Sequence, residues 1–281
     1  MNRSRDPHPR TTRRYATRLL LVAAVIGSAC APAGSTASTA QPIRIMTYNI
    51  FAGHDLARAS NLSRIAALID SLGVDVVLLQ EVDRNTTRSG RVDQPAVLAR
   101  LTGLHPVFAR AMDFDGGEYG IAILSRWPIR AARVVPLDIP RPPELTAPYE
   151  PRTLLHVTIG SPQGIVHVLN THVDHRADPL FRQLQLVQVL AYIAEAVPAD
   201  AAIVLGGDLN AGPSSAEVRA VRLAFDDAWL RCGEGEGLTF RSDEPDRRID
   251  YVMLARATCR SARVLERTYS DHRPLVVDVM R

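Results

Sequence analysis

Four groups of polar residues stand where strongly apolar runs of this chain begin or end. They read M-T-Y-N-I (Met46 to Ile50), L-L-Q-E-V (Leu78 to Val82), G-G-D-L-N-A (Gly206 to Ala211) and, near the C-terminus, Y-S-D-H-R-P-L-V-V-D-V. A short apolar run is typical of a buried strand, and its end is where a sheet gives way to surface loops. The groups therefore predict oxygen ligands for a hard divalent cation and an acid-supported histidine at the ends of strands.

Apolar periodicity along the chain alternates between helical and strand-like. Helical spacing covers residues 62–72, 92–101, 179–196 and 213–223, and strand-like runs cover residues 43–50, 74–80, 120–124, 133–137, 153–159, 165–170, 201–205, 249–254 and 275–279. The S-P-Q-G tetrapeptide at 161–164 is a hairpin signal, so a purely parallel sheet is excluded. The pattern predicts one mixed α/β layered domain without repeats, and a surface loop on the substrate rim over the proline-rich residues 136–151.

The charge of the chain is concentrated at its N-terminus. Six of the 33 basic residues and one of the 30 acidic residues precede Cys30, so the remainder carries 27 basic and 29 acidic residues. No lysine occurs, and the remaining arginines are scattered. The expected mature domain therefore lacks the basic stripe that duplex DNA binding demands, which makes nucleic acid the less favoured partner.

Residues 1–29 have the layout of a signal peptide. A cationic start precedes the apolar run L-L-L-V-A-A-V-I-G at 19–27, which is too short to span a bilayer. Cys30 follows G-S-A, which resembles a bacterial lipoprotein cleavage box except that Gly27 stands where an aliphatic residue is usual. The alternative is ordinary signal-peptide cleavage after Ala31, Ala33 or Ala40. We expect an exported protein, periplasmic, extracellular or anchored to a membrane through lipidated Cys30, with a tether at 30–42 and a catalytic domain at 43–281.

Export bears on the two other cysteines of the chain. An oxidising compartment favours pairing, so Cys232 and Cys259 are expected to form a disulfide. The alternative is two unrelated buried thiols.

Two strand ends carry candidate metal ligands. Glu81 ends a strongly apolar run, where a carboxylate must be solvated or paired, and a magnesium-like ion would satisfy it. A plain salt bridge to an arginine such as Arg84 is the alternative. Asn49 occupies the matching end of the first predicted strand.

Two further strand ends carry candidate catalytic groups. Asp208 and Asn210 are two residues apart after a buried run, so both can face one side, where a carboxylate can orient or deprotonate water. His272 needs a carboxylate to fix its tautomer; we assign that role to Asp250 and leave the adjacent Asp271 for the metal.

The segment N-T-H-V-D-H (170–175) has two interpretations. His172, Asp174 and His175 match most of the H-x-H-x-D-H zinc motif of metallo-β-lactamase-like hydrolases. The first ligand of that motif, a histidine, is replaced by Asn170, and an amide is a poor zinc ligand. The favoured interpretation is that His172 donates a hydrogen bond to the scissile phosphate.

In this order, T-Y-N-I, L-L-Q-E-V, N-T-H-V-D-H, G-G-D-L-N and S-D-H-R-P-L resemble the endonuclease/exonuclease/phosphatase superfamily of deoxyribonuclease-like metal-dependent phosphoesterases, across residues 43–279. The stretches Q-E-V-D-R-N-T-T-R-S-G and D-G-G-E-Y-G-I-A-I-L-S-R are similar to an exported bacterial branch. The resemblance implies a four-layer α/β/β/α sandwich of two packed mixed sheets flanked by helices, and a dependence on Mg²⁺ or Mn²⁺.

The resemblance also implies roles for single residues. The family's metal-binding region corresponds to Glu81, Asn49 and Asp271. Its water-orienting and phosphate-binding positions correspond to Asp208 and Asn210. The remaining assignments are the Asp250–His272 pair, phosphate contacts by His172 and His175, and a cleft lining or structural role for Arg126 and Tyr119.

The sequence thus predicts an exported phosphodiester hydrolase that uses in-line attack by water. Its substrate would be nucleic acid, a phospholipid head group or a small ester, and no protein partner is implied. Two alternatives stay open: a zinc hydrolase of the metallo-β-lactamase type, and a non-catalytic surface binding module.

Overall fold

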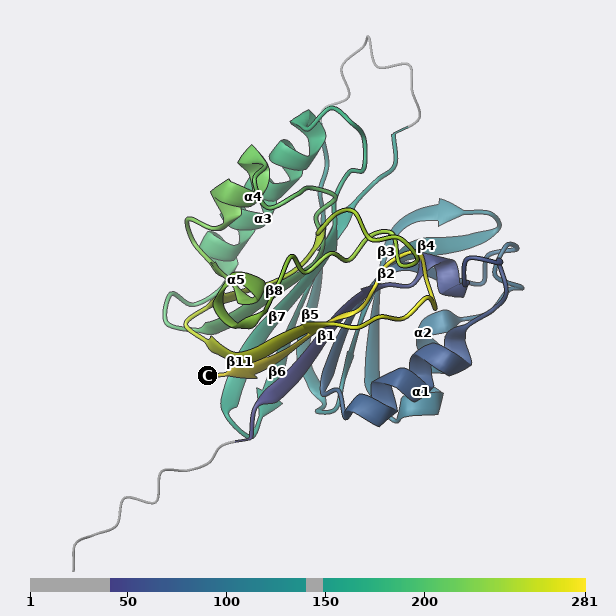
Figure 1. The fold of residues 1–281 in the computed structure, drawn as a ribbon, viewed down its shortest axis with the longest axis horizontal. Helices are drawn as coiled ribbons and strands as arrows, with labels where there is room; N and C mark the ends of the chain where they lie inside the picture. Colours follow the sequence, from purple (N-terminus) through teal and green to yellow (C-terminus); the bar gives the residue numbers. More distant parts are fainter. Residues whose placement is uncertain (1–40, 140–148) are drawn as a thin grey trace, which may run out of the picture. The chain divides into compact units, whose positions relative to one another are not determined.

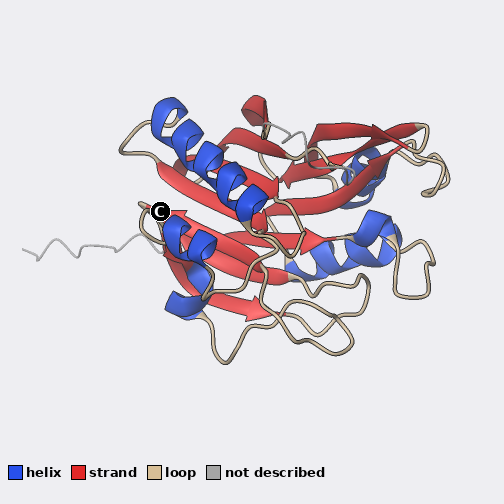
Figure 2. Ribbon diagram, turned by 90° about the horizontal axis from the view of Figure 1, so that it is seen from above, coloured by secondary structure: helices blue, strands red, loops and turns tan. Residues whose placement is uncertain are grey.

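The computed structural model describes residues 41–139 and 149–281 (Figure 1). The expected signal peptide, most of the tether and residues 140–148 of the expected proline-rich loop lie outside the described residues. Within the described ranges, two six-stranded sheets pack face to face and helices cover their outer faces (Figure 2). The α/β/β/α sandwich implied by the sequence resemblance is confirmed.

The first sheet has the strand order β11-β12-β1-β2-β4-β3. Its parallel pair is β1 with β2, and the other neighbours are antiparallel. The strands are β1 (Ile43–Asn49), β2 (Val76–Arg84), β3 (His105–Phe114), β4 (Gly117–Ser125), β11 (Thr258–Val264) and β12 (Leu275–Met280). Because a parallel pair needs a crossover, α1 (Leu62–Leu72) connects β1 to β2.

The second sheet has the strand order β5-β6-β7-β8-β10-β9. Here β7 and β8 are parallel and are connected through α3 (Leu180–Ala196), and the remaining pairs are antiparallel. The strands are β5 (Ile129–Pro136), β6 (Thr153–Ser161), β7 (Gly164–His172), β8 (Ala202–Asp208), β9 (Asp226–Asp227) and β10 (Asp250–Ala255). The predicted S-P-Q-G hairpin is confirmed, since β6 and β7 pair across it.

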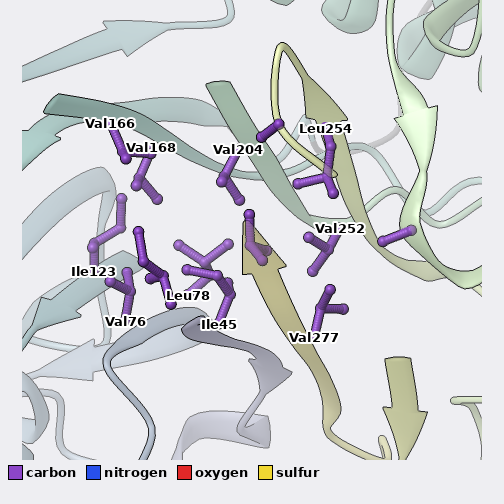
Figure 3. Packing of buried hydrophobic residues seen from close by; sticks show 14 of the residues in the cluster. Ile45, Val76, Leu78, Ile123, Val166, Val168, Val204, Val252, Leu254 and Val277 are labelled. Carbon is purple, nitrogen blue, oxygen red and sulfur yellow. The ribbon is translucent and has the colours of Figure 1, made fainter. Parts of the chain in front are cut away.

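Three apolar clusters hold the layers together. The middle cluster lies between the sheets and contains Ile45 and Leu78 from the first sheet and Val204 from the second (Figure 3). Since side chains alternate along a strand, Met46 points the other way, into the cluster under α1 and α2 (Gln94–Thr102). The third cluster lies under α3 and α4 (Ala216–Val221). None of the described helices is long and apolar enough to span a membrane.

Every predicted helix is present, but several short or exposed elements were not predicted. They are β3, β9, β11, α5 (Ala228–Cys232) and the 3₁₀ turn η1 (Phe51–Gly53). Nine of the ten residues of β3 are exposed or only partly buried, so no apolar run marks it. An edge strand of this kind lacks the continuous apolar signal of the central strands.

The predicted disulfide between Cys232 and Cys259 is present and ties α5 to β11. Cross-linking residues that are 27 positions apart removes conformational entropy from the unfolded chain. We expect the Cys232→Ser/Cys259→Ser double variant to lose roughly 3 kcal/mol of unfolding free energy. Urea unfolding of the oxidised and variant proteins measures the difference, and equal midpoints would contradict it.

Candidate active site

The polar groups of the sequence meet at one edge of the sandwich because strand direction brings them there. Asn49 and Glu81 lie at or near the carboxyl end of two parallel strands, β1 and β2, and His172 and Asp208 end the parallel pair β7 and β8. In the antiparallel β10, the first residue, Asp250, lies directly opposite Asp208.

A cleft of about 330 Å³ opens at this edge. Of the residues singled out from the sequence, it is lined by Glu81, Tyr119, His172, His175, Asp208, Asn210, Asp271 and His272. Asn49 and Asp250 lie just behind this wall and contact it. The cleft is also lined by residues that the sequence did not indicate, namely Arg88, Met112, Phe114, Glu150, Arg152 and Phe240.

Asp208 lies at the centre of the polar wall. Its Oδ2 is 3.6 Å from Nε2 of His172 and 3.6 Å from Nε2 of His272, and it accepts a hydrogen bond of 3.2 Å from Asn49. The backbone N–H of Asn210 donates to Oδ1 at 2.8 Å. Burial raises the pKa of Asp208, and the nearby Asp250 carboxylate raises it further. A carboxylate with a raised pKa between two imidazoles is equipped to accept a proton near neutral pH.

A glycine allows β7 to approach Asp208 this closely. Gly207 has φ +133°, and a Cβ there would lie 1.9 Å from the carbonyl oxygen of Thr171. A side chain at this position would therefore push His172 away from Asp208.

The two histidines of the cleft have opposite charge preferences. Nδ1 of His272 is 2.8 Å from Oδ2 of Asp250, the pairing that the sequence predicted. Although burial alone lowers the pKa of His272, the Asp250 and Asp208 carboxylates raise it to about 10. Burial lowers the pKa of His172 well below its ordinary value, with the positive charge of Arg152 adding to the effect. At neutral pH the site therefore holds one imidazolium, His272, and one neutral imidazole, His172.

Glu81 is turned into the cleft by an irregularity in β2. The pairing register with β4 shifts between Leu79 and Val82, and Glu81 has φ +53°, the left-handed region that a non-glycine residue rarely occupies. Asn49 donates to its Oε1 at 3.1 Å. Burial and then the Asp271 carboxylate raise the pKa of Glu81. The alternative pairing of Glu81 with Arg84 is wrong, because Arg84 pairs with Glu118.

Arg152 is the main polar group of the cleft that the sequence did not reveal. It lies directly before β6, is only 4% exposed, and its Nη2 contacts Glu150 at 3.1 Å and His175 Nδ1 at 3.1 Å. Its Nε and Nη1 have no hydrogen-bond partner among the described residues. Buried guanidinium N–H groups are normally satisfied, so this pair is suited to an anionic ligand.

The family model described as "Endonuclease/Exonuclease/phosphatase family" matches residues 46–272, which is most of the chain. The chain belongs to this family. No curated protein sequence matches it.

Solved structures with the same fold include other members of this family. A Beutenbergia cavernae endonuclease/exonuclease/phosphatase is 26% identical, with TM-score 0.70, over 85% of this chain and 72% of that one. A Bacteroides thetaiotaomicron mannosyl-6-phosphatase is 18% identical, with TM-score 0.71, over 85% of this chain and 100% of that one. The human Nocturnin catalytic domain is 22% identical, with TM-score 0.64, over 85% and 93% of the two chains.

Family membership raises the question of whether the residues present fit a divalent cation. Candidate ligand atoms of Asp208, Asp250 and His272 lie within 4.8 Å of one another, and the two carboxylates are the donors among them because His272 is protonated. Oδ1 of Asp250 is buried without a partner in the described part of the chain. Glu81 and Asp271 add two carboxylates whose pKa values burial raises. Four acids gathered in one cleft repel one another, so a hard dication fits this donor set.

Three residues singled out from the sequence lie apart from the cleft. Arg126 pairs with Asp75 at 2.6 Å, next to the opposite end of β2 from Glu81, so its expected place in the cleft lining is wrong. Asp174 pairs with Arg176 at 2.8 Å and does not line the cleft, so it forms no zinc site with His172 and His175. Asn170 is buried between the sheets, where it donates to the carbonyls of Leu79 and Ala122.

Proposed function

We propose that this protein is a divalent-metal-dependent phosphoesterase that hydrolyses a phosphodiester by in-line attack of water. The observation that supports it most is the Asp208 carboxylate, held between the Nε2 atoms of His172 and His272 while Asp250 supports His272. A proton acceptor beside a neutral and a charged imidazole can activate water and stabilise negative charge at phosphorus. No covalent intermediate is required.

Four side chains of the cleft act on the water or the phosphate in this proposal. Asp208 takes the proton of the attacking water. His272, charged because of Asp250, and the N–H of neutral His172 donate to the oxygens of the phosphate as charge develops on them. The guanidinium of Arg152 binds a phosphate oxygen through its two unpartnered N–H groups.

Glu81 and Asp271 would hold Mg²⁺ or Mn²⁺ in this proposal, and Asn49 would orient the Glu81 carboxylate for the ion. When bound, the ion supplies Lewis-acid polarisation of a phosphate oxygen. Asn49 joins this group to the catalytic one, because its Nδ2 donates to both Glu81 and Asp208.

We further propose that the protein is exported, on the signal-like residues 1–29, and that lipidation of Cys30 would place it beside a membrane. The scattered arginines and the absence of lysine argue against duplex DNA as the substrate. A mannosyl-6-phosphatase among the solved structures shows that this fold can also act on small phosphate esters.

Hydrolysis of bis(p-nitrophenyl) phosphate tests the proposal. We expect nitrophenolate release with Mg²⁺, its loss with EDTA, and its recovery when excess Mg²⁺ is added. Plasmid DNA, sphingomyelin and phosphatidylinositol, assayed in the same way, separate the substrate classes. Absence of metal-dependent hydrolysis of every ester would refute the proposal.

Binding of the ion has a readout that does not depend on turnover. Mg²⁺ should raise the thermal unfolding midpoint of the wild type, because it relieves repulsion among the buried acids. Glu81→Gln should abolish this shift, whereas Glu195→Gln, an exposed acid on α3, should retain it. Equal shifts in both variants would remove Glu81 from the metal site.

A further inference from the structure

The β3–β4 hairpin has two chemically different faces. Residues that alternate along a strand share a face, and the register pairs Met112 with Tyr119 and Phe114 with Gly117. Met112, Phe114 and Tyr119 therefore lie on one face. The other face is charged and includes the ion pair of Arg110 with Asp113.

The outer part of this apolar face, Met112 and Phe114, is not part of the protein core, whereas Tyr119 at its inner end is buried. All three of its side chains line the cleft, and none belongs to the three apolar clusters of the described residues. Phe114 is 36% exposed. Tyr119 lies next to the polar wall, where burial and then the Glu81 carboxylate raise the pKa of its hydroxyl. An apolar face left open beside a polar centre indicates a binding surface rather than a packing one.

A fixed guanidinium completes this surface. Arg88 Nε and Nη2 donate to the two carboxylate oxygens of buried Asp83, each at 2.8 Å. Its Cζ lies 4.5 Å from the centroid of the Phe114 ring and 5.4 Å from that of the Tyr119 ring. Because Asp83 neutralises its charge and fixes its plane, Arg88 offers a flat stacking surface and not a free cation.

We propose that Met112, Phe114, Tyr119 and Arg88 form an aromatic subsite for the nucleobase of a small nucleotide ester. This inference rests on the proposed function, because it places the phosphate of the same ligand at Asp208 and Arg152. Aromatic rings and guanidinium planes are the groups on which bases stack, whichever base is present. The cleft of about 330 Å³ has room for one such small ester.

The same surface suits the other ester classes less well. A sugar needs polar groups around its hydroxyls, whereas this face offers a thioether and two rings. An acyl chain would remove water from Arg88 and Glu150, both of which line the cleft. A planar base matches the rings and leaves the edge of the guanidinium bonded to Asp83.

A pair of ligands that differ only in the base tests the inference. Adenosine 5′-monophosphate and ribose 5-phosphate share the sugar and the phosphate, and an Asp208→Asn background slows their turnover. Isothermal titration calorimetry with Mg²⁺ should show roughly tenfold or tighter binding of the nucleotide, the range of one stacked base.

Substitutions at Phe114 show whether the flat ring is responsible. In the same background, Phe114→Tyr should keep the tenfold preference, and Phe114→Ala and Phe114→Leu should lose most of it, while ribose 5-phosphate binding stays unchanged. Leu101→Ala, at an exposed apolar residue of α2 outside the cleft lining, is the control and should keep the preference.

Three results would overturn the inference. They are equal affinities for the two ligands, a full preference retained by Phe114→Leu, or tighter binding of hexyl phosphate than of the nucleotide. Failure of the proposed function is distinguishable, because it would appear as absent ester hydrolysis by the wild type while the preference for the nucleotide persisted.

Discussion

Replacing Asp208 by asparagine should lower turnover of the preferred ester by roughly 100-fold or more, the range of a lost general base. Asparagine has nearly the same shape and can still accept the hydrogen bond from the Asn210 backbone, but it cannot take a proton from water. The same change removes repulsion between two buried acids, since Asp250 raises the pKa of Asp208. We therefore expect the thermal unfolding midpoint to stay unchanged or to rise while activity falls.

The matched control for this substitution is Asp226→Asn. Asp226 is about half exposed and pairs with Arg231 away from the cleft, so its loss should leave turnover within twofold. Steady-state kinetics at saturating substrate measures both variants. Asp208→Asn with turnover near that of the control would show that Asp208 is not the proton acceptor.

The central layers of the fold could be predicted from the sequence because burial leaves a periodic signal. The helix expected at 62–72 and the strands β1, β7 and β8 were found because their apolar residues face packed neighbours. Edge strands carry no such signal: β11 reads T-C-R-S-A-R-V, and one of its seven residues is fully buried. Backbone hydrogen bonds pair β11 with β12, and the apolar periodicity of a sequence does not indicate where such bonds form.

Strand direction explains which cleft residues could be predicted. Tyr119 is near the start of β4 and Arg126 follows its end, and β4 runs antiparallel to β2. Only the start of β4 can therefore lie beside Glu81, so Tyr119 lines the cleft and Arg126 lies at the opposite end of the sheet. The predicted S-P-Q-G hairpin carried the corresponding signal for Arg152. Residues that precede β6 must lie opposite the end of β7, where His172 was already expected.

The aromatic subsite had no comparable signal in the sequence. Phe114 and Met112 belong to β3, which was not predicted, and a register shift between Arg110 and Met112 determines which way their common face points. A bulge of this kind changes which side chains face the cleft without changing the composition of the strand. Residues that determine the substrate were thus harder to predict than residues that carry the chemistry.

Replacing Arg152 by methionine should lower kcat/KM by roughly 100-fold or more, because two charge-assisted hydrogen bonds to the phosphate are lost. The loss should fall mainly on KM if these bonds already form with the bound substrate. Methionine keeps the stem of the side chain and removes a buried charge whose Nε and Nη1 have no partner among the described residues. The unfolding midpoint should therefore not fall, since the cost of two unsatisfied buried N–H groups outweighs the lost pair with the partly exposed Glu150.

Arg182→Met is the matched control for this prediction. Arg182 is also buried, but its Nε donates to Glu217 at 3.0 Å, outside the cleft lining. Its replacement leaves a buried carboxylate unpaired, so stability should fall while kcat/KM of the folded fraction is retained. Opposite changes in activity and stability for the two arginines would show that Nε and Nη1 of Arg152 are kept without protein partners for its ligand. A fall in stability without a change in KM for Arg152→Met would instead assign it a structural role.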